Sequence, residues 1–415
     1  MDLGWKDSKA DPDVYIRPQV KPDGTKYYEY LLVYVDDIMC ISHEPEVTMK
    51  AIAGLYRLKN DEVAPPDRYL GANVGKYQLP DGRWVWSISA NDYVKSAVKN
   101  LRETLKSEGR DLPMKDAERP FPKSYRPELD VSPMLDDEMA NRYMHLIGVL
   151  RWACELGRID MLAEVASLAT HLCAPRIGHL ETVYKIFAYL QKHERSTMVF
   201  DDLQIEIDES LFVPVDWKDF YDVESEELPP NMPTPRGNTV RIVIYVDANH
   251  AGNVLTRRSQ SGILIFVNNA PIMWLSKKQN TVEAATFGSE FNAMRVAVEM
   301  NKGLRYKLRM FGIPIEGPTS IFCDNESVVK NTSLPHSTLQ KKHHSISYHF
   351  VREEAARGAI RIAKIDGKHN LADLFTKTTI PTDDRKRLLQ EILYFGKPTS
   401  SAEESEEKDK KIGTA

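Results

Sequence analysis

The alternation of apolar and polar positions is most regular in the second half of the chain. Residues 241–246 carry apolar side chains at both odd and even positions, and Asp247 follows directly. Such a run predicts a strand covered on both faces, and a carboxylate buried at its end is costly without a partner. Shorter apolar runs at 263–267 and 272–275, joined by a turn at 268–271, predict two more strands of an antiparallel meander.

Three later acids occupy comparable positions in predicted elements. Glu290 continues the core-facing stripe of a helix predicted from about residue 284 to 310. Asp324 ends the short apolar strand 320–323, and Asp373 lies in the first turn of a further helix. Each acid has a structural explanation of its own, as an N-cap or as a first-turn carboxylate favoured by the helix dipole. Four separate explanations are less economical than one site that collects all four side chains.

In the first half of the chain, apolar runs at 31–35 and 38–41 flank Asp36 and Asp37. This pattern predicts a tight β-hairpin with acids at its tip. Two adjacent acids are good turn residues. They are also the ligands that Mg²⁺ takes together with substrate phosphates. The pattern alone leaves both interpretations open.

The remaining segments are predicted to be mostly helical. Residues 46–115 predict a helix, short strands and a second helix, and the proline-rich segment 111–127 predicts a connector. Apolar residues recurring at three and four predict long helices over 136–172 and 178–193. The acidic, proline-rich segment 215–238 predicts a linker.

Size and composition limit the class of protein. At 415 residues the chain exceeds what one core usually serves, so we expect two or three domains. A formal net charge of −5 argues against a protein that coats nucleic acid nonspecifically, but the uneven charge leaves room for a local basic groove. The four scattered cysteines form no CxxC and indicate neither a disulfide framework nor a zinc site. No signal peptide or membrane-spanning run is evident, so we expect an intracellular protein.

Several motifs between about residues 7 and 377 resemble copia-type LTR-retrotransposon Pol polyproteins. YVDD at 34–37 resembles the YxDD box of reverse transcriptases, and SKADPDVYI at 8–16 and RYLG at 68–71 resemble the palm of that family. YMHLIGVL and HLETVYKIFAYL resemble the helical segments that follow the palm. The match is looser between these boxes, where GRIDM at 157–161 stands in place of the usual TRPDI.

The order of strand-end Asp, helix Glu, strand-end Asp and helix-start Asp resembles that of ribonuclease H domains. SEFNAMRVAV around Glu290, FCDNES around Asp324 and KHNLADLFTK around Asp373 match box by box, while FGS at 287–289 departs from the usual STEAE run. The resemblance implies that Asp247, Glu290, Asp324 and Asp373 are catalytic and bind two Mg²⁺ or Mn²⁺ ions, since four converging carboxylates repel one another without cations. It also implies hydrolysis of the RNA strand of an RNA–DNA hybrid.

The same resemblance implies that Asp36 and Asp37 are catalytic, metal-binding residues of a polymerase. In the family a further palm aspartate, well upstream of YxDD, completes that metal site. The chain begins after that point and lacks the fingers. We therefore expect half a polymerase site, with RNA-directed DNA polymerase activity only where the missing palm and fingers are supplied.

Basic residues and histidines near the acid boxes are further candidates. Six basic side chains are candidates for contacting nucleic-acid phosphates, although half of them can equally be solvated surface: Arg257, Arg258, Lys277, Lys278, Lys341 and Lys342. His343, His344 and His349 suggest a metal, but no cysteine lies at ligand spacing and the stretch is predicted to be helical. A structural or substrate-proximal role is favoured, with His343 or His344 as a proton carrier.

The sequence therefore predicts a multidomain protein of mixed α+β and α/β class. Its expected parts are a partial reverse transcriptase palm and thumb (1–115), a mostly helical connection (116–214), an acidic linker (215–238), a ribonuclease H-like mixed-sheet domain (239–380), and a C-terminal helix with a disordered acidic tail (381–415).

The predicted function is that of a retrotransposon-derived Pol fragment with a metal-dependent ribonuclease H. A non-catalytic remnant that binds nucleic acid or a protein partner is the alternative, and a recombinase of the same fold is disfavoured because such sites usually end in Glu. The resemblance implies an RNA–DNA hybrid and the remainder of the Pol polyprotein as partners. It also implies a place in cytoplasmic virus-like particles, in the nucleus, or in both.

Overall fold

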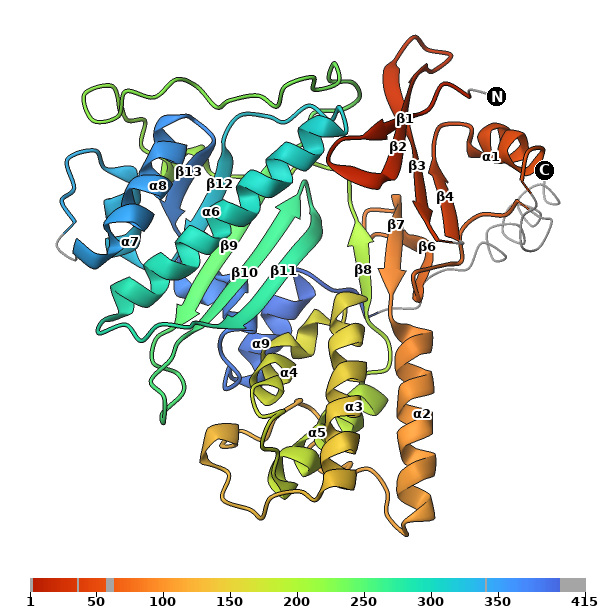
Figure 1. Cartoon of the computed structure of the whole chain (residues 1–415), viewed down its shortest axis with the longest axis vertical. Coiled ribbons are helices and arrows are strands. Elements are labelled where there is room, and N and C mark those ends of the chain that lie inside the picture. The colour runs from red at the N-terminus through yellow and green to blue at the C-terminus, as the bar shows by residue number, and fades with distance from the viewer. Residues whose placement is uncertain (1–2, 36, 57–62, 340–341, 396–415) are drawn as a thin grey trace.

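The structure is a computed structural model that describes residues 3–35, 37–56, 63–339 and 342–395. Within these residues the strands form three sheets, and the predicted mixture of α and β structure is confirmed. Figure 1 shows a small N-terminal sheet, a helical group below it, and a larger sheet crossed by a long helix, α6. Asp36, Lys341 and the acidic C-terminal tail lie outside the described residues. None of the described helices is long and apolar enough to cross a membrane.

The N-terminal sheet contains the predicted hairpin. Its strands pair antiparallel in the order β1-β2-β3-β4, and helix α1 (Pro45–Ala53) follows. Strands β3 and β4 place Tyr34 opposite Asp37, and Val35 takes a positive φ of 52° in the turn. The strands are β1 (Lys6–Ser8), β2 (Asp11–Val20), β3 (Lys26–Tyr34) and β4 (Asp37–Ile41).

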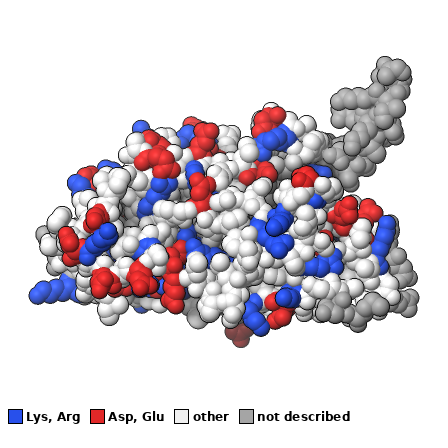
Figure 2. Space-filling view, turned by 90° about the horizontal axis from the view of Figure 1, so that it is seen from above, with Lys and Arg blue, Asp and Glu red and all other residues white. Residues whose placement is uncertain are grey.

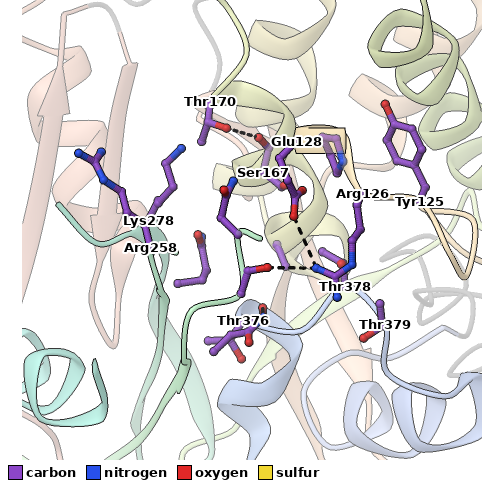
Figure 3. Close-up of a pocket in the computed structure, with 16 residues that line it drawn as sticks. Tyr125, Arg126, Glu128, Ser167, Thr170, Arg258, Lys278, Thr376, Thr378 and Thr379 are labelled. Carbon is purple, nitrogen blue, oxygen red and sulfur yellow. Dashed lines mark hydrogen bonds and ion pairs between the residues drawn. The ribbon is translucent and has the colours of Figure 1, made fainter. Parts of the chain in front are cut away.

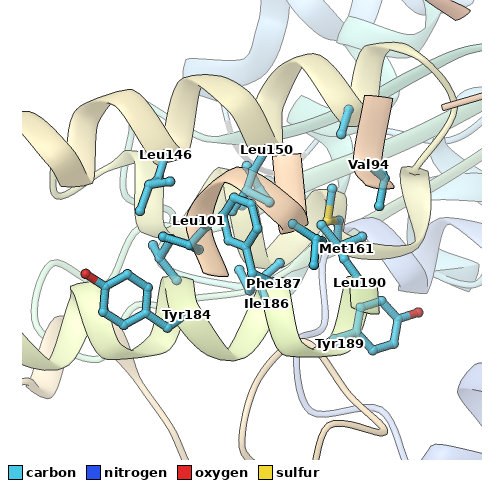
Figure 4. Packing of buried hydrophobic residues seen from close by; sticks show 14 of the residues in the cluster. Val94, Leu101, Leu146, Leu150, Met161, Tyr184, Ile186, Phe187, Tyr189 and Leu190 are labelled. Atoms are coloured by element: carbon cyan, nitrogen blue, oxygen red, sulfur yellow. The ribbon is translucent and has the colours of Figure 1, made fainter. Parts of the chain in front are cut away.

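A second sheet joins segments from both sides of the helical region. Strand β8 (Thr197–Phe200) pairs antiparallel with β7, so a strand that follows the helices completes the sheet β5-β6-β7-β8. One hydrophobic core runs from Ala72 to Leu190, and Figure 4 shows its packing between the helices. The region predicted as thumb and the region predicted as connection therefore share one core. The other elements are β5 (Arg68–Tyr69), β6 (Ala72–Gln78), β7 (Trp84–Ser89), α2 (Asn91–Ser107), α3 (Asp137–Glu155), α4 (Leu162–Ala169) and α5 (Ile177–Lys192).

The helix predicted over 136–172 is two helices with a break between them. Helix α3 ends at Glu155, a 3₁₀ turn spans Ile159–Met161, and α4 then begins. Gly157 lies in the break with a φ of 105°, a backbone conformation that a right-handed helix cannot contain. The expectation of one continuous helix was wrong because apolar periodicity continues through this glycine.

The largest sheet has the strand order β11-β10-β9-β12-β13. Its first three strands form the predicted antiparallel meander, and β12 pairs in parallel with both β9 and β13. Helices α6, α7 and α8 cover one face, and the other face packs on the C-terminal segment with α9. The elements are β9 (Ile242–Asn249), β10 (Gln260–Val267), β11 (Ala270–Lys278), α6 (Thr286–Met310), β12 (Thr319–Cys323), α7 (Glu326–Ser333), α8 (Ser345–Ala356), β13 (Ile360–Lys364) and α9 (Thr382–Gln390).

The segment predicted as a linker is anchored to the largest sheet's helices. Glu226 accepts hydrogen bonds from Arg305 and Arg309 of α6 at 2.5–2.8 Å. The guanidinium of Arg352 on α8 lies 4.9 Å from the Trp217 ring centroid and donates to the Tyr221 hydroxyl at 3.0 Å. The segment has little regular structure, as expected, but specific contacts fix it in place.

A buried ionic network joins the helical region to the C-terminal helix. Arg158 and Asp160 pair at 2.8–3.0 Å with both side chains fully buried. Arg385 of α9 donates to the Asp160 carbonyl and to Glu164 at 3.2 Å. Burial opposes ionisation of Asp160, but the Arg158 guanidinium outweighs it and lowers the pKa of this carboxyl to about 2. The network fixes α9 against α4.

We expect Arg385→Met to lower the free energy of unfolding by about 3–5 kcal/mol, because Glu164 is left buried without its cation. Arg387→Met on the same helix is the matched control, since the Arg387 side chain is 40% exposed. The measurement is the urea midpoint of each purified variant at constant m value. Equal midpoints for the two variants would contradict the role assigned to Arg385.

Candidate metal centre

Two of the predicted acids become neighbours through strand pairing. Strand β12 runs parallel to β9 with Cys323 opposite Val246. Asp247 is the next residue on β9, and Asp324 directly follows β12. The parallel register therefore brings both acids to the same edge of the sheet. The β9 strand continues past Asp247 to Asn249, so this acid lies within the strand rather than at its end.

Glu290 and Asp373 reach the same edge from elements on opposite faces of the sheet. Glu290 lies in the second turn of α6 and is 4% exposed. Asp373 lies in a 3₁₀ helix, Leu371–Phe375, which is capped by Asn370. The Asn370 side chain accepts a hydrogen bond from the Ala372 amide and donates to the Val246 carbonyl at 3.0 Å. This amide fixes the 3₁₀ helix beside β9.

A glycine opposite Asp247 allows that close approach. Gly262 of β10 pairs with Asp247, and a Cβ atom there would lie 2.6 Å from the Thr376 methyl group and 2.7 Å from the Ala372 carbonyl oxygen. Any larger side chain would push the 3₁₀ helix away from the sheet. Gly262 therefore sets how near Asp373 comes to Asp247.

The four predicted acids lie together. Carboxylate oxygens of Asp247, Asp324 and Asp373 are within 4.8 Å of one another, and so are the potential ligand atoms of Glu290, Cys323 and Asp324. Asp324 belongs to both groups. The four acids that the sequence analysis assigned to one site are thus close together in the structure.

The electrostatics of this cluster oppose four negative charges. Burial, followed by the nearby charges of Asp247 and Asp324, raises the pKa of Glu290 to about 10. Burial is also the main cause that raises the pKa of Asp247 to about 6, while Lys377 opposes the shift. The pKa values of Asp324 and Asp373 are raised too, first by burial and then by neighbouring acids. Ionised together, these groups require positive charge between them.

Two further residues of the site escaped the sequence interpretation. Lys377 donates to Asp373 at 2.5 Å and lies 3.8 Å from Asp247, and Thr376 donates its hydroxyl proton to Asp247. The signal was present in the KHNLADLFTK box, because Lys377 stands four residues after Asp373, the spacing of neighbours on a helix. Lys377 is the local counter-charge of the cluster.

The residues present fit a divalent cation of the Mg²⁺ class. Carboxylate oxygens from four side chains are the donors such cations prefer. Glu290 Oε2 is buried and has no hydrogen-bond partner among the described residues, so it is available as a ligand. Burial and the charge of Glu290 raise the pKa of the Cys323 thiol well above its usual value, which leaves a neutral thiol rather than a thiolate ligand.

A polar cavity lies between the helical region and the largest sheet, and one residue of its wall, Thr376, donates to Asp247. It has a volume of about 90 Å³, and its lining includes Arg126, Arg258, Lys278 and Thr376 (Figure 3). Arg126 donates to the Gly252 carbonyl at 3.0 Å and so links the two regions. Burial and the nearby Arg258 lower the pKa of Lys278.

The other predicted site residues lie elsewhere. Arg257, Lys277 and Lys342 are exposed, and Asp37 is exposed at the start of β4, in a different sheet from the four acids. His349 contacts the Tyr221 hydroxyl at 2.7 Å. Lys341 and Asp36 are among the undescribed positions.

His343 and His344 face Glu283 rather than the four acids. Their Nε2 atoms lie 3.6 and 3.1 Å from Glu283 Oε2. The sequence analysis did not connect Glu283 with these histidines. Nothing in the local pattern links residues 60 positions apart, so only the fold could reveal this group.

Charge on the surface is mixed. Figure 2 shows Lys and Arg interspersed with Asp and Glu over the face that it displays. The mixture on this face agrees with the small formal net charge of −5. Two basic side chains, Arg258 and Lys278, come together in the cavity between the helical region and the largest sheet.

Comparison with known proteins shows similarity to proteins of transposons. The chain is 22% identical over 378 residues to the Retrovirus-related Pol polyprotein from transposon RE1 of Arabidopsis thaliana. The aligned region covers 90% of this chain and 22% of that protein. It is 23% identical over 351 residues to the corresponding protein from transposon RE2 of the same plant. The aligned region covers 84% of this chain and 20% of that protein. The chain thus spans about a fifth of the length of these relatives.

No protein-family model matches the chain. Among solved structures, LC11-RNase H1 in complex with an RNA/DNA hybrid aligns with 34% of this chain and 96% of its own length, at 18% identity and a TM-score of 0.27. The expected kinship is confirmed: homologues over most of the chain are retrovirus-related Pol polyproteins of copia-type transposons.

We expect Asp247→Asn to raise the free energy of unfolding of the metal-free chain by about 1–3 kcal/mol at pH 7.5. The folded-state pKa of Asp247, about 6, lies above its usual 3.8. Ionisation therefore costs stability, and this cost grows as pH rises from about 4 through 6. Thermal unfolding in EDTA at pH 7.5 and pH 4 is the measurement, and the gain should vanish at pH 4.

Asp219→Asn, which removes an exposed acid, is the control and should change nothing. If Asp247→Asn is no more stable than the unmodified chain in EDTA at pH 7.5, the repulsion assigned to the cluster is refuted. Saturating Mg²⁺ should favour the unmodified chain, because binding to the folded state adds stability.

Proposed function

We propose that this chain, whose homologues are retrovirus-related Pol polyproteins, carries a metal-dependent ribonuclease H that cuts the RNA strand of an RNA–DNA hybrid. The observation that carries the proposal is the convergence of Asp247, Glu290, Asp324 and Asp373 at one edge of the largest sheet. These are the residues that the resemblance to ribonuclease H domains picks out in the sequence. We also propose that the centre holds two Mg²⁺ or Mn²⁺ ions.

Bound divalent cations would supply an activated water and stabilise the leaving oxygen of a phosphodiester. The chain's own residues prepare the site for them. Thr376 donates to Asp247 and fixes the orientation of that carboxylate, while Lys377 holds Asp373 at 2.5 Å. Asp324 and Asp373 are only partly buried and face the accessible side of the centre, while Asp247 and Glu290 form its buried base.

The cavity between the helical region and the largest sheet supports a path for the hybrid's backbone. Arg258 and Lys278 contribute positive charge, and Thr378 and Thr379 contribute hydroxyl groups at its wall (Figure 3). Phosphate oxygens accept hydrogen bonds from these groups. Thr376 belongs to the cavity wall and also donates to Asp247. A phosphate bound in the cavity would therefore lie near the acids that act on the scissile bond.

For the N-terminal region we propose a polymerase role only in combination with the rest of a Pol polyprotein. Asp37 lies at the tip of the β3–β4 hairpin, exposed, as a metal ligand of such a site would have to be. A place in virus-like particles or in the nucleus is proposed on the same kinship.

We expect Asp247→Asn and Asp324→Asn each to lower hybrid cleavage by at least about a thousandfold, because each removes several kcal/mol of charge stabilisation from the metal centre. The assay uses the purified chain, a labelled RNA–DNA hybrid, and Mg²⁺ or Mn²⁺. Asp219→Asn is the matched control and should retain full activity. Hybrid binding without any cleavage by the unmodified chain would instead support a non-catalytic remnant.

We expect Arg258→Ala with Lys278→Ala to weaken hybrid binding and to flatten its dependence on salt. Each lost phosphate contact should reduce the slope of log K against log salt concentration by about 0.9. Filter binding between 50 and 200 mM salt in EDTA measures this without cleavage. Lys99→Ala, an exposed cation on α2, is the control. An unchanged slope in the double variant would remove the cavity from the binding path.

A further inference from the structure

A second group of potential metal ligands lies at the start of α6. Glu283 precedes the helix, and His343 and His344 belong to a 3₁₀ turn, Lys342–His344. The Nε2 atoms of both histidines point at the same oxygen, Glu283 Oε2, at 3.6 and 3.1 Å. All three ligand atoms lie within 4.8 Å of one another.

The spacing is that of ligands around one small cation. Zn²⁺ binds imidazole nitrogen and carboxylate oxygen at about 2.0–2.2 Å in a tetrahedron, so neighbouring ligand atoms are about 3.3–3.5 Å apart. The two nitrogen-to-oxygen distances, 3.1 and 3.6 Å, bracket this value. Two imidazoles and one carboxylate also select a transition metal over Mg²⁺, which prefers oxygen donors.

We propose that Glu283, His343 and His344 bind one transition-metal ion of the Zn²⁺ class, separate from the four-carboxylate centre. Three protein ligands leave a fourth position for water or for a group of a bound molecule. The ion would tie the turn that opens α8 to the loop that opens α6.

The residues around Glu283 and His344 allow these two side chains to come close together. The side chains of Glu283 and His344 are only 8% and 9% exposed. A Cβ atom at Gly288 would lie 2.4 Å from Glu283 Oε2 and 3.0 Å from His344 Nε2, so only glycine lets the two ligands meet beside the helix. The rings of Phe287 and Phe291 pack near the His344 ring and limit solvent on that side. His343, at 63% exposure, leaves the site open to entering ions.

A simple ion pair explains only part of this arrangement. One imidazole within hydrogen-bond distance is enough for Glu283 Oε2, and His344 Nε2 lies at 3.1 Å from it. The His343 Nε2 atom approaches the same oxygen at 3.6 Å, with its ring 4.2 Å from the His344 ring, and a hydrogen bond does not account for this second approach. A cation between three ligands accounts for both histidines at once.

The experiment titrates the metal-stripped full chain with Zn²⁺ against a chromogenic competitor, and with Co²⁺ while recording the visible spectrum. We expect one tightly bound Zn²⁺ and Co²⁺ bands of tetrahedral type. Loss of an outer-shell partner costs about 10–100-fold in affinity. His343→Ala and His344→Ala should therefore each cost more than about 100-fold, and His145→Ala, an exposed histidine on α3, should cost nothing.

Gly288→Ala tests the site without removing a ligand and should lower Zn²⁺ affinity about 10–100-fold by displacing Glu283. Thermal unfolding in EDTA establishes that each variant is folded. Asp247→Asn should leave Zn²⁺ affinity unchanged, which separates this site from the carboxylate centre. Failure to bind one Zn²⁺, equal binding by the His343→Ala/His344→Ala double variant, or loss of binding in Asp247→Asn would each overturn the proposal.

Discussion

The mutual repulsion of four buried or half-buried carboxylates is the constraint on which the largest sheet and its surroundings depend. Burial and neighbouring charge raise the pKa of each acid, and the contacts of Lys377 and Thr376 with the cluster offset this only in part. The fold has to supply the opposing free energy. It does so through apolar packing on both faces of β9, where Ile244 and Val246 face α6 and Val243 faces the C-terminal segment. Strain at a functional site offset by packing elsewhere is a general feature of natural proteins.

The packing that holds the cluster is not confined to the region from 239 to 380. The core on the α9 face of the sheet includes Ile159 and Met198 from the helical region, together with Leu388 and Leu389 of α9. The buried ion pair of Arg385 with Glu164 crosses the same boundary. The 3₁₀ helix that carries Asp373 lies within this shared core, since Leu374 and Phe375 are part of it. The position of Asp373 thus depends on segments more than 150 residues earlier in the chain.

The sequence predicted those parts of the site that repeat a local pattern. The strand around residues 241–246, the meander and the helix bearing Glu290 all follow from apolar periodicity, and the structure contains each of them. Contacts between distant segments left no such signal. The anchoring of the acidic segment through Glu226, and the pairing of Glu283 with two histidines, depend on tertiary folding alone. At Gly157 a local pattern was misleading. Apolar residues continue at helical spacing through this position, but its positive φ ends the helix.

The start of α6 brings two different donor sets close together, and their chemistry keeps them distinct. Glu283 and Glu290 are seven residues apart, yet one faces two imidazoles and the other faces only acids and a neutral thiol. A hard cation gains little from imidazole nitrogen, and a borderline cation gains most from it. Gly288 stands between them, and a Cβ atom there would lie 2.4 Å from Glu283 Oε2. Glu283, before α6, and Glu290, in its second turn, therefore belong to two donor sets of different chemistry on either side of Gly288.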